Sequence, residues 1–238
     1  MKMYKRVLLK LSGEALSAPD NAFNPVLLKS LAEEMKEVLG MGVQVGIVVG
    51  GGNIIRGKFA SQLGLPRVQA DKMGMLATLI NALAVQGALE VNGVPAYVQT
   101  AFEAPRAADV ADARKAIQHL EAGEVVIFGG GTGNPYFSTD SGSALRACEI
   151  QAEVILMAKN GVDGVYTADP RKDPTATKYE KITYQEVLDK QLGVIDLTAA
   201  SMCQENHIDA VVFNMNDIAN ISRACMGENI GTLITGGE

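Results

Sequence analysis

The 238-residue sequence predicts an α/β protein built on a mainly parallel β-sheet. Short apolar runs alternate with longer amphipathic segments from one end of the chain to the other, which is typical of repeated β-α-β units. The apolar runs are rich in β-branched residues, as expected for strands that are buried on both faces of a parallel sheet. Two of these runs, Val45–Val49 and Val125–Phe128, lead directly into glycine triplets.

The first helix has the clearest boundary signals. Asn24 is a favourable N-cap, Pro25 suits the first helical position, and Leu31, Met35 and Val38 recur at helical spacing. Further helices are predicted at Asp71–Val91, Asp109–Leu120, Asp140–Ile150, Tyr184–Lys190, Thr198–Asn206 and Ile218–Met226. Strands are predicted at Val7–Leu11, Val45–Val49, Ala96–Gln99, Val125–Phe128, Val154–Met157, Ala210–Phe213 and Thr232–Ile234.

The segment 162–181 has a different character. Its centre, Asp169–Pro174, is too polar and too interrupted by proline for a helix or a strand, so we expect a loop or hairpin excursion. No linker, low-complexity tract or internal repeat interrupts the rest of the series. We therefore expect residues 1–238 to form a single domain, with an N-terminal and a C-terminal lobe that share one sheet.

Composition and charge narrow the class of protein. The net charge of −6 argues against a broad basic surface for nucleic acid. Cys148, Cys203 and Cys225 are odd in number and far apart, so we expect buried free thiols in a reducing compartment and no disulfide framework or zinc site. The N-terminal apolar run is too short for a signal peptide, and no continuous apolar stretch reaches about 18 residues. We expect a cytoplasmic protein that does not bind membranes.

The glycine triplets Gly50–Gly52 and Gly129–Gly131 predict phosphate-binding loops. Ligands of open α/β sheets bind beyond the carboxyl ends of the strands, and glycine lets backbone N–H groups approach an anion closely. A single triplet is explained equally well by turn formation. Two triplets at two strand exits favour two anionic groups held over one sheet.

Three charged residues fit the same interpretation. Lys10 interrupts the apolar run Val7–Leu11, where a buried ammonium needs an anionic partner, although an edge strand that points Lys10 into water is an alternative. Arg56 follows the first glycine triplet and could reach the phosphate that this loop would bind. Asp140 begins a predicted helix and could face the bound phosphates at the edge of the sheet, or it could be only the N-cap of that helix. Together these groups suit phosphoryl transfer, which depends on positioning, Mg²⁺ and stabilisation of charge.

Several other chemistries lack their motifs. The sequence has no G-x-x-x-x-G-K-[ST] element of P-loop enzymes, and neither triplet fits the G-x-G-x-x-G dinucleotide fingerprint. His119 and His207 have no recognisable serine or cysteine partner, so we interpret them as ordinary core or surface residues. Hydrolase chemistry by a histidine triad is therefore not expected.

Several sequence blocks occur in order along the chain: Lys10–Leu16, Gly50–Asn53 with Arg56 and Gly57, Asp71–Thr78, Thr132–Asp140 and Val162–Pro170. The Asp-x-Met-Gly-Met and Thr-Gly-Asn-Pro motifs within them are far more specific than glycine triplets. Together the blocks resemble the bacterial UMP kinases of the amino acid kinase superfamily, over essentially the whole chain. The resemblance implies a three-layer αβα sandwich and Mg²⁺-dependent phosphoryl transfer from ATP to UMP.

The resemblance also implies roles for individual residues, with UMP bound by the N-terminal lobe and ATP by the C-terminal lobe. The implied catalytic residues are Lys10, Arg56 and Asp140. The implied ATP-binding residues are Lys10, Leu11, Ser12, Gly13, Gly52, Arg56, Asn160, Tyr166 and Asp169. The implied UMP-binding residues are Gly51, Asp71, Thr132, Gly133, Asn134, Pro135, Tyr136, Phe137, Ser138 and Thr139. It identifies no direct metal ligand.

Regulation and assembly are implied as well. Members of the family are typically homohexamers, with GTP as a possible activator. UTP is expected to inhibit by competing with UMP, because both would use the same uracil and ribose contacts. Ser17–Asn24 departs from the Gly-Phe-Gly stretch linked to GTP activation, so we expect weaker activation here.

Two alternatives to a UMP kinase remain. A same-fold kinase of a carboxylate or carbamate, such as glutamate or acetylglutamate, would not need the ribose-binding carboxylate of Asp71. A non-catalytic nucleotide-binding protein is less compatible with retention of Lys10, Arg56 and Asp140.

Overall fold

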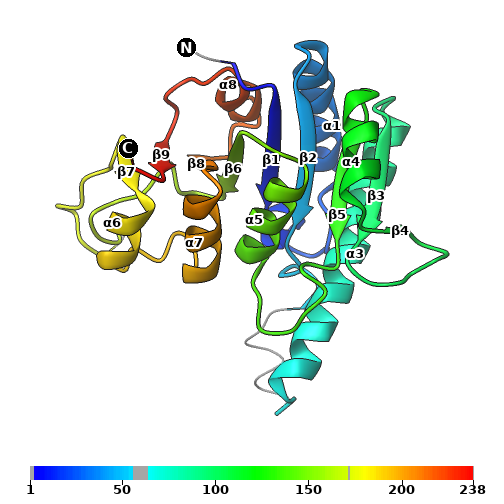
Figure 1. The fold of residues 1–238 in the computed structure, drawn as a ribbon, viewed down its shortest axis with the longest axis horizontal. Coiled ribbons are helices and arrows are strands. Elements are labelled where there is room, and N and C mark those ends of the chain that lie inside the picture. Colours follow the sequence, from blue (N-terminus) through cyan, green and yellow to red (C-terminus); the bar gives the residue numbers. More distant parts are fainter. Residues whose placement is uncertain (1–2, 56–63, 171, 238) are drawn as a thin grey trace.

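A computed structural model describes residues 3–55, 64–170 and 172–237. Within this part of the chain, nine strands form one sheet in the order β4-β3-β5-β2-β1-β6-β8-β9-β7 (Figure 1). Their bounds are β1 Arg6–Leu11, β2 Gln44–Val49, β3 Ala96–Thr100, β4 Asp109–Val110, β5 Val125–Gly129, β6 Val154–Lys159, β7 Lys181–Thr183, β8 Asp209–Asn214 and β9 Thr232–Thr235. Only β8 and β9 pair antiparallel among these described strands. The prediction of a mainly parallel sheet is confirmed.

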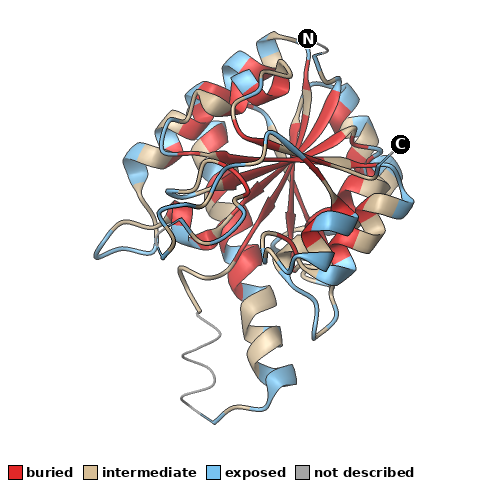
Figure 2. Cartoon of the chain, turned by 90° about the vertical axis from the view of Figure 1, so that its left-hand side faces the viewer, coloured by how far each residue is buried: buried red, intermediate tan, exposed pale blue. Residues whose placement is uncertain are grey.

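Helices cover both faces of the sheet, so the three-layer sandwich is confirmed (Figure 2). Their bounds are α1 Pro25–Gly40, α3 Arg67–Val91, α4 Ala113–Glu121, α5 Thr139–Glu149, α6 Tyr184–Asp189, α7 Leu197–Glu205 and α8 Asn220–Cys225, with a 3-10 helix, η1, at Gly13–Leu16. One core cluster joins the sheet to α1, α3 and α8, and the other joins it to α4, α5, α6 and α7.

The two core clusters follow from the alternation of side chains along each strand. In β1, Val7, Leu9 and Leu11 pack in the cluster of α1 and α3, whereas Leu8 packs in the cluster of α5. Because successive side chains point to opposite faces, Lys10 shares the face of Leu8. The lysine that interrupts the apolar run therefore lies on the side of the sheet that α5 covers.

Several predicted elements differ from the structure near their ends, among them α3, which begins at Arg67 and not at the predicted Asp71. The helix expected at Asp109–Leu120 begins only at Ala113, and Asp109 and Val110 instead form the short strand β4 beside β3. The reason is that Asp112 is the N-cap, with its carboxylate accepting the N–H of Lys115 at 2.9 Å. The excursion predicted for 162–181 is confirmed, except that β7 begins at its last residue.

Helix α3 needs separate comment, because by length and composition alone it is apolar enough to cross a membrane. Its Leu79, Val85 and Leu89 are buried in the core cluster with α1 and the sheet. Its N-terminal end projects beyond the sheet (Figure 1). These contacts identify α3 as a core helix of the sandwich.

The three cysteines are free, as predicted. Cys203 and Cys225 are buried, and Cys148 is partly buried. Burial raises the pKa of Cys203 and of Cys225 to about 12, which keeps both thiols protonated and unreactive.

Candidate active site

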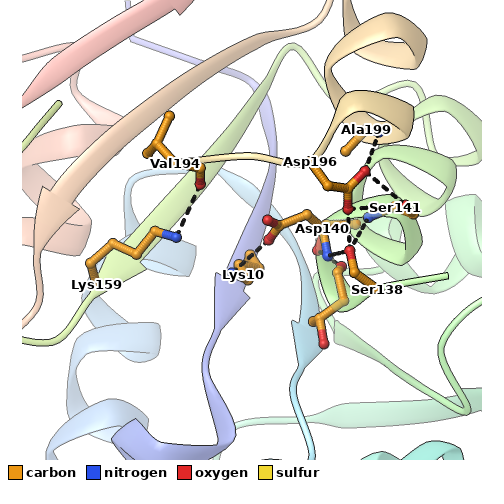
Figure 3. A network of polar contacts seen from close by, with 10 residues as sticks. Lys10, Ser138, Asp140, Ser141, Lys159, Val194, Asp196 and Ala199 are labelled. Atoms are coloured by element: carbon orange, nitrogen blue, oxygen red, sulfur yellow. Dashed lines mark hydrogen bonds and ion pairs between the residues drawn. The ribbon is translucent and has the colours of Figure 1, made fainter. Parts of the chain in front are cut away.

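An ion pair between Lys10 and Asp140 lies at the carboxyl edge of the sheet, near its centre (Figure 3). β1 is flanked by β2 and β6, so the edge-strand alternative for Lys10 is wrong. Lys10 is 8% exposed, and its Nζ atom lies 2.7 Å from Oδ1 of Asp140. The N-cap of α5 is Ser138, so the alternative that Asp140 is only an N-cap is also wrong. The carboxylate of Asp140 instead faces the lysine.

A second lysine, Lys159, reaches the same region from the end of β6 (Figure 3). Its Nζ atom donates to the carbonyl oxygen of Val194 at 3.2 Å. Burial and then the positive charge of Lys10 lower the pKa of Lys159 to about 8, while Asp140 acts in the opposite direction. Asp140 supplies one negative charge against these two cations, so a bound anion would complete the charge balance.

One cavity, of about 440 Å³, lies beside this ion pair on the side of β2 and α3. We refer to it as the acceptor-side cavity. Among the residues that line it are Gly51, Gly52, Asp71, Thr132, Asn134, Phe137, Ser138 and Thr139. The structure thus brings together most of the residues predicted to bind UMP, and adds Gly52, which was predicted for ATP. Gly133, Pro135 and Tyr136 belong to the same loop without lining the cavity.

Asp71 joins α3 to the 132–139 loop. Its Oδ2 atom accepts the backbone N–H of Tyr136 at 2.8 Å and the Nε–H of Arg67 at 3.2 Å. The guanidinium of Arg67 also lies over the ring of Tyr136, 5.3 Å from its centroid. Tyr136 has a φ of 73°, which is uncommon for a residue other than glycine and indicates that these contacts hold the loop.

Helix α3 also forms hydrogen bonds with both glycine loops. Asn81 is fully buried, and its Nδ2 atom donates to the carbonyl of Gly50 at 2.6 Å and to Oδ1 of Asn53 at 2.7 Å. The hydroxyl of Thr78, three residues earlier and on the same helix face, accepts the N–H of Gly130 at 2.8 Å. Gly130 has a φ of 80°, a conformation that favours glycine. One face of α3 therefore sets the relative position of the two predicted phosphate loops.

A second cavity, of about 600 Å³, lies on the side of β6 and the 162–170 segment. We refer to it as the donor-side cavity. Lys159, Tyr166 and Asp169 are among its lining residues. The hydroxyl of Tyr166 donates to Oδ1 of Asp163 at 2.7 Å, which raises the pKa of Tyr166 and lowers the pKa of Asp163. Asn160 is exposed and lies next to the lining residue Lys159 in the chain.

The remaining predicted ATP-binding residues lie at the end of β1, in the turn after it, or outside the described residues. The side chain of Leu11 is fully buried on the α1 face, so only its backbone is available to a ligand. The hydroxyl of Ser12 caps η1. Gly13 packs tightly against the first glycine loop, because a Cβ there would lie 2.6 Å from the backbone nitrogen of Gly52. Arg56 lies outside the described residues.

Sequence reasoning missed three residues that the structure places at this site. Lys159 ends a buried strand as Lys10 does, and this parallel was an available signal. Asn81 is an amide inside an otherwise apolar stretch of helix, which signals a buried hydrogen-bonding role. Asp196 precedes α7 and binds Ser138 and Ser141 at the start of α5, a contact over 55 residues or more that local patterns do not report.

Comparisons with known proteins agree with this geometry. The sequence profile of the Amino acid kinase family matches residues 5–214. A uridylate kinase of Pediococcus pentosaceus is 54% identical over 236 residues, which cover 99% of this chain and 98% of that protein. The crystal structure of UMP kinase from Bacillus anthracis has a TM-score of 0.96 at 40% identity, covering 100% of this chain and 98% of that one. For UMP kinase from Ureaplasma parvum the TM-score is 0.93 at 39% identity, covering 99% and 100%. The chain therefore belongs to the amino acid kinase family and, within it, to the uridylate kinases.

Proposed function

We propose that this protein is a UMP kinase, which transfers the γ-phosphoryl group of ATP to UMP and yields ADP and UDP for pyrimidine nucleotide synthesis. The observation that carries the proposal is the buried Lys10–Asp140 pair, whose two residues adjoin residues that line the two cavities. Thr139, which precedes Asp140 in the chain, lines the acceptor-side cavity. Lys159 lines the donor-side cavity, and burial and the charge of Lys10 lower its pKa. Phosphoryl transfer needs positioned substrates and stabilised charge, which this arrangement supplies.

An ADP-release assay with ATP and a panel of acceptors tests the proposal. UMP, CMP, dUMP, glutamate and acetylglutamate are offered separately. Rapid ADP release with UMP, and little with glutamate or acetylglutamate, is the expected result. Turnover of a carboxylate in place of UMP would favour the other kinase class, and nucleotide binding without any turnover would favour a non-catalytic protein.

Mg²⁺ belongs to the proposed reaction, and the residues present fit an ion that arrives with the nucleotide. In the described part of the chain, no group of three or more His, Cys, Asp or Glu side chains could hold a resident metal. Mg²⁺ in kinases is commonly held by one or two carboxylates together with substrate phosphates, and Asp140 is positioned to be such a carboxylate. The bound ion neutralises charge on the phosphates. Lys10 and Lys159 would hold the phosphate oxygens directly.

Replacing Asp71 with asparagine is expected to raise KM for UMP and to leave KM for ATP nearly unchanged. A carboxylate that accepts hydrogen bonds from ribose hydroxyls binds the ground state and the transition state about equally, so its loss appears in KM. Arg67→Ala is the matched control, since it removes a partner of Asp71 outside the cavity. If KM for ATP rises as much as KM for UMP in steady-state kinetics, Asp71 does not belong to the acceptor site.

Raising the pH above about 8 is expected to raise KM for ATP. The pKa of Lys159 is lowered to about 8, so its ammonium is charged below this pH, can pair with the donor phosphates, and loses its proton above it. Lys159→Arg should make KM for ATP flat over the same range, because arginine stays protonated up to about pH 12. Lys159→Met should have a high KM at every pH. An arginine variant with the wild-type pH profile would exclude Lys159 as the titrating group.

UTP is proposed to inhibit by competing with UMP, because both would use the uracil and ribose contacts at Thr132, Asn134 and Asp71. GTP activation is proposed to be weaker than is usual in the family, since an effector must bind the active state more tightly than the inactive one. In this chain Ala18–Asn24 is held by contacts such as the 2.7 Å hydrogen bond from Asn53 to the carbonyl of Ala22. Initial rates at subsaturating ATP, with and without GTP, test this. Strong activation that disappears in Phe23→Ala would contradict it.

Assembly and location are part of the same proposal. A homohexamer and a cytoplasmic location are expected for a member of this family. Sedimentation equilibrium of the purified protein would measure the mass of the assembly directly.

A further inference from the structure

Asp196 has contacts that capping a helix does not require. It is the N-cap of α7, and its Oδ1 atom accepts the N–H of Ala199 at 2.9 Å. The same carboxylate also accepts the hydroxyl of Ser141, 3.2 Å from each oxygen, and the hydroxyl of Ser138 in a short hydrogen bond. Asp196 lines neither of the two cavities described above. Its carboxylate therefore binds the first turn of α5 from outside the substrate space.

The contact with Ser138 extends to the ion pair (Figure 3). The Oγ atom of Ser138 accepts the N–H of Asp140 at 3.0 Å and the N–H of Ser141 at 3.2 Å. Both acceptor positions of the hydroxyl are then occupied, and its one proton is donated to Asp196. A continuous chain thus runs from Asp196 through Ser138 to the backbone of Asp140, whose carboxylate holds Lys10.

The segment that carries Asp196 also holds the other lysine. The carbonyl of Val194, two residues earlier, accepts the hydrogen bond from Nζ of Lys159. Residues 194–196 therefore contact a lysine of the donor-side cavity at one end and the first turn of α5 at the other. The Ser138 contact is additional to the cap of α7, which Asp196 already forms with Ala199.

We propose that Asp196 is a positioning residue for phosphoryl transfer, which fixes Asp140 and hence Lys10 through the hydroxyl of Ser138. The inference rests on the kinase activity proposed above. Reaction rates depend steeply on such placement, and a displacement of about 1 Å can lower the rate about 10²-fold. A carboxylate near bound phosphates could instead bind Mg²⁺. The experiment below distinguishes this role from the positioning of Asp140.

Three variants isolate the contact. Asp196→Asn keeps an oxygen for the N–H of Ala199, but its amide nitrogen cannot accept the proton of Ser138. Asp196→Ala removes both functions. Asp112→Ala is the matched control, because Asp112 caps α4 through the N–H of Lys115, and both α4 and α7 have nine residues. Each loss of a cap is expected to lower the melting temperature by about 2–4 °C.

Kinetics and amide hydrogen exchange are measured for all three variants and for Ser138→Ala. For Asp196→Asn, kcat is expected to fall on the order of 10-fold, with little change in melting temperature and smaller changes in both KM values. For Asp196→Ala it should fall about 10²-fold. Asp112→Ala should keep the wild-type kcat. Exchange at the amides of Asp140 and Ser141 should accelerate in both Asp196 variants and not in Asp112→Ala. In the double variant of Asp196→Asn with Ser138→Ala, the two losses of kcat should not add.

Wild-type kcat and wild-type exchange in Asp196→Asn would overturn the inference. So would an equal loss of kcat in Asp112→Ala, which would indicate general destabilisation, or recovery of Asp196→Asn at high Mg²⁺, which would indicate a metal ligand. Absence of UMP-dependent turnover in the wild-type protein would instead contradict the proposed function. Hydrogen exchange would then still decide whether Asp196 fixes the first turn of α5.

Discussion

Lys10→Ala is expected to lower kcat by about 10²–10³-fold, the usual cost of losing one preorganised charge contact with a transition state. Lys10 is buried at the carboxyl end of a central strand, and the carboxylate of Asp140 fixes its ammonium. That ammonium needs no rearrangement to meet negative charge as it develops on the transferred phosphoryl group. Binding of UMP should change little, because the acceptor-side cavity is lined by other residues.

The measurement is steady-state kinetics with UMP and ATP varied separately. Lys29→Ala is the control, since Lys29 is an exposed lysine that pairs with Glu33 on α1, the helix that covers the sheet face opposite to Lys10. The Lys29→Ala variant removes one positive charge outside the candidate active site and should keep the wild-type kcat. A wild-type turnover number in Lys10→Ala would remove Lys10 from the mechanism.

Local sequence patterns were sufficient for most elements, because each strand is a short β-branched run and each helix carries a period of 3.6 residues. They misplaced the start of α3, which is Arg67 and not Asp71, and the start of α4, which is Ala113 and not Asp109. Asp109 and Asp112 are equally good capping residues, and the choice between them depends on Asp109 pairing with Gln99 in β3, a partner distant in sequence. Elements fixed by local spacing were thus predictable, and a boundary fixed by strand pairing was not.

The candidate site shows the same division. The motif blocks contain many of the residues that line the two cavities, but they could not distinguish a central strand from an edge strand for Lys10. That distinction comes from β6, which pairs with β1 although the paired residues, such as Val7 and Val154, lie far apart in the chain. Lys159 acquires its lowered pKa only through burial and through Lys10 on the neighbouring strand. Charge environments of this kind depend on which strands are neighbours in the sheet, so they cannot be predicted from a short stretch of sequence.

Asp140→Ala is expected to lower both kcat and stability. Removing one partner of a buried ion pair typically costs about 3–5 kcal/mol, and somewhat less is expected here because the side chains of Lys10 and Asp140 are 10% and 18% exposed. The ammonium of Lys10 would also lose the charge that opposes its repulsion from Lys159. Lys10 would then shift from its position, and this shift removes the contact with the phosphoryl group. We expect kcat to fall at least as far as in Lys10→Ala.

The double variant Lys10→Met with Asp140→Ala separates the structural cost from the chemical one. Replacing a buried ion pair with apolar side chains is often neutral for stability, because the cost of burying the charges disappears together with their attraction. The melting temperature of the double variant should therefore recover toward the wild-type value, while kcat remains as low as in Asp140→Ala. Thermal unfolding and initial rates on the same samples measure both quantities. Recovery of activity with recovery of stability would show that the pair only supports the fold, whereas stability without activity would assign the pair to catalysis.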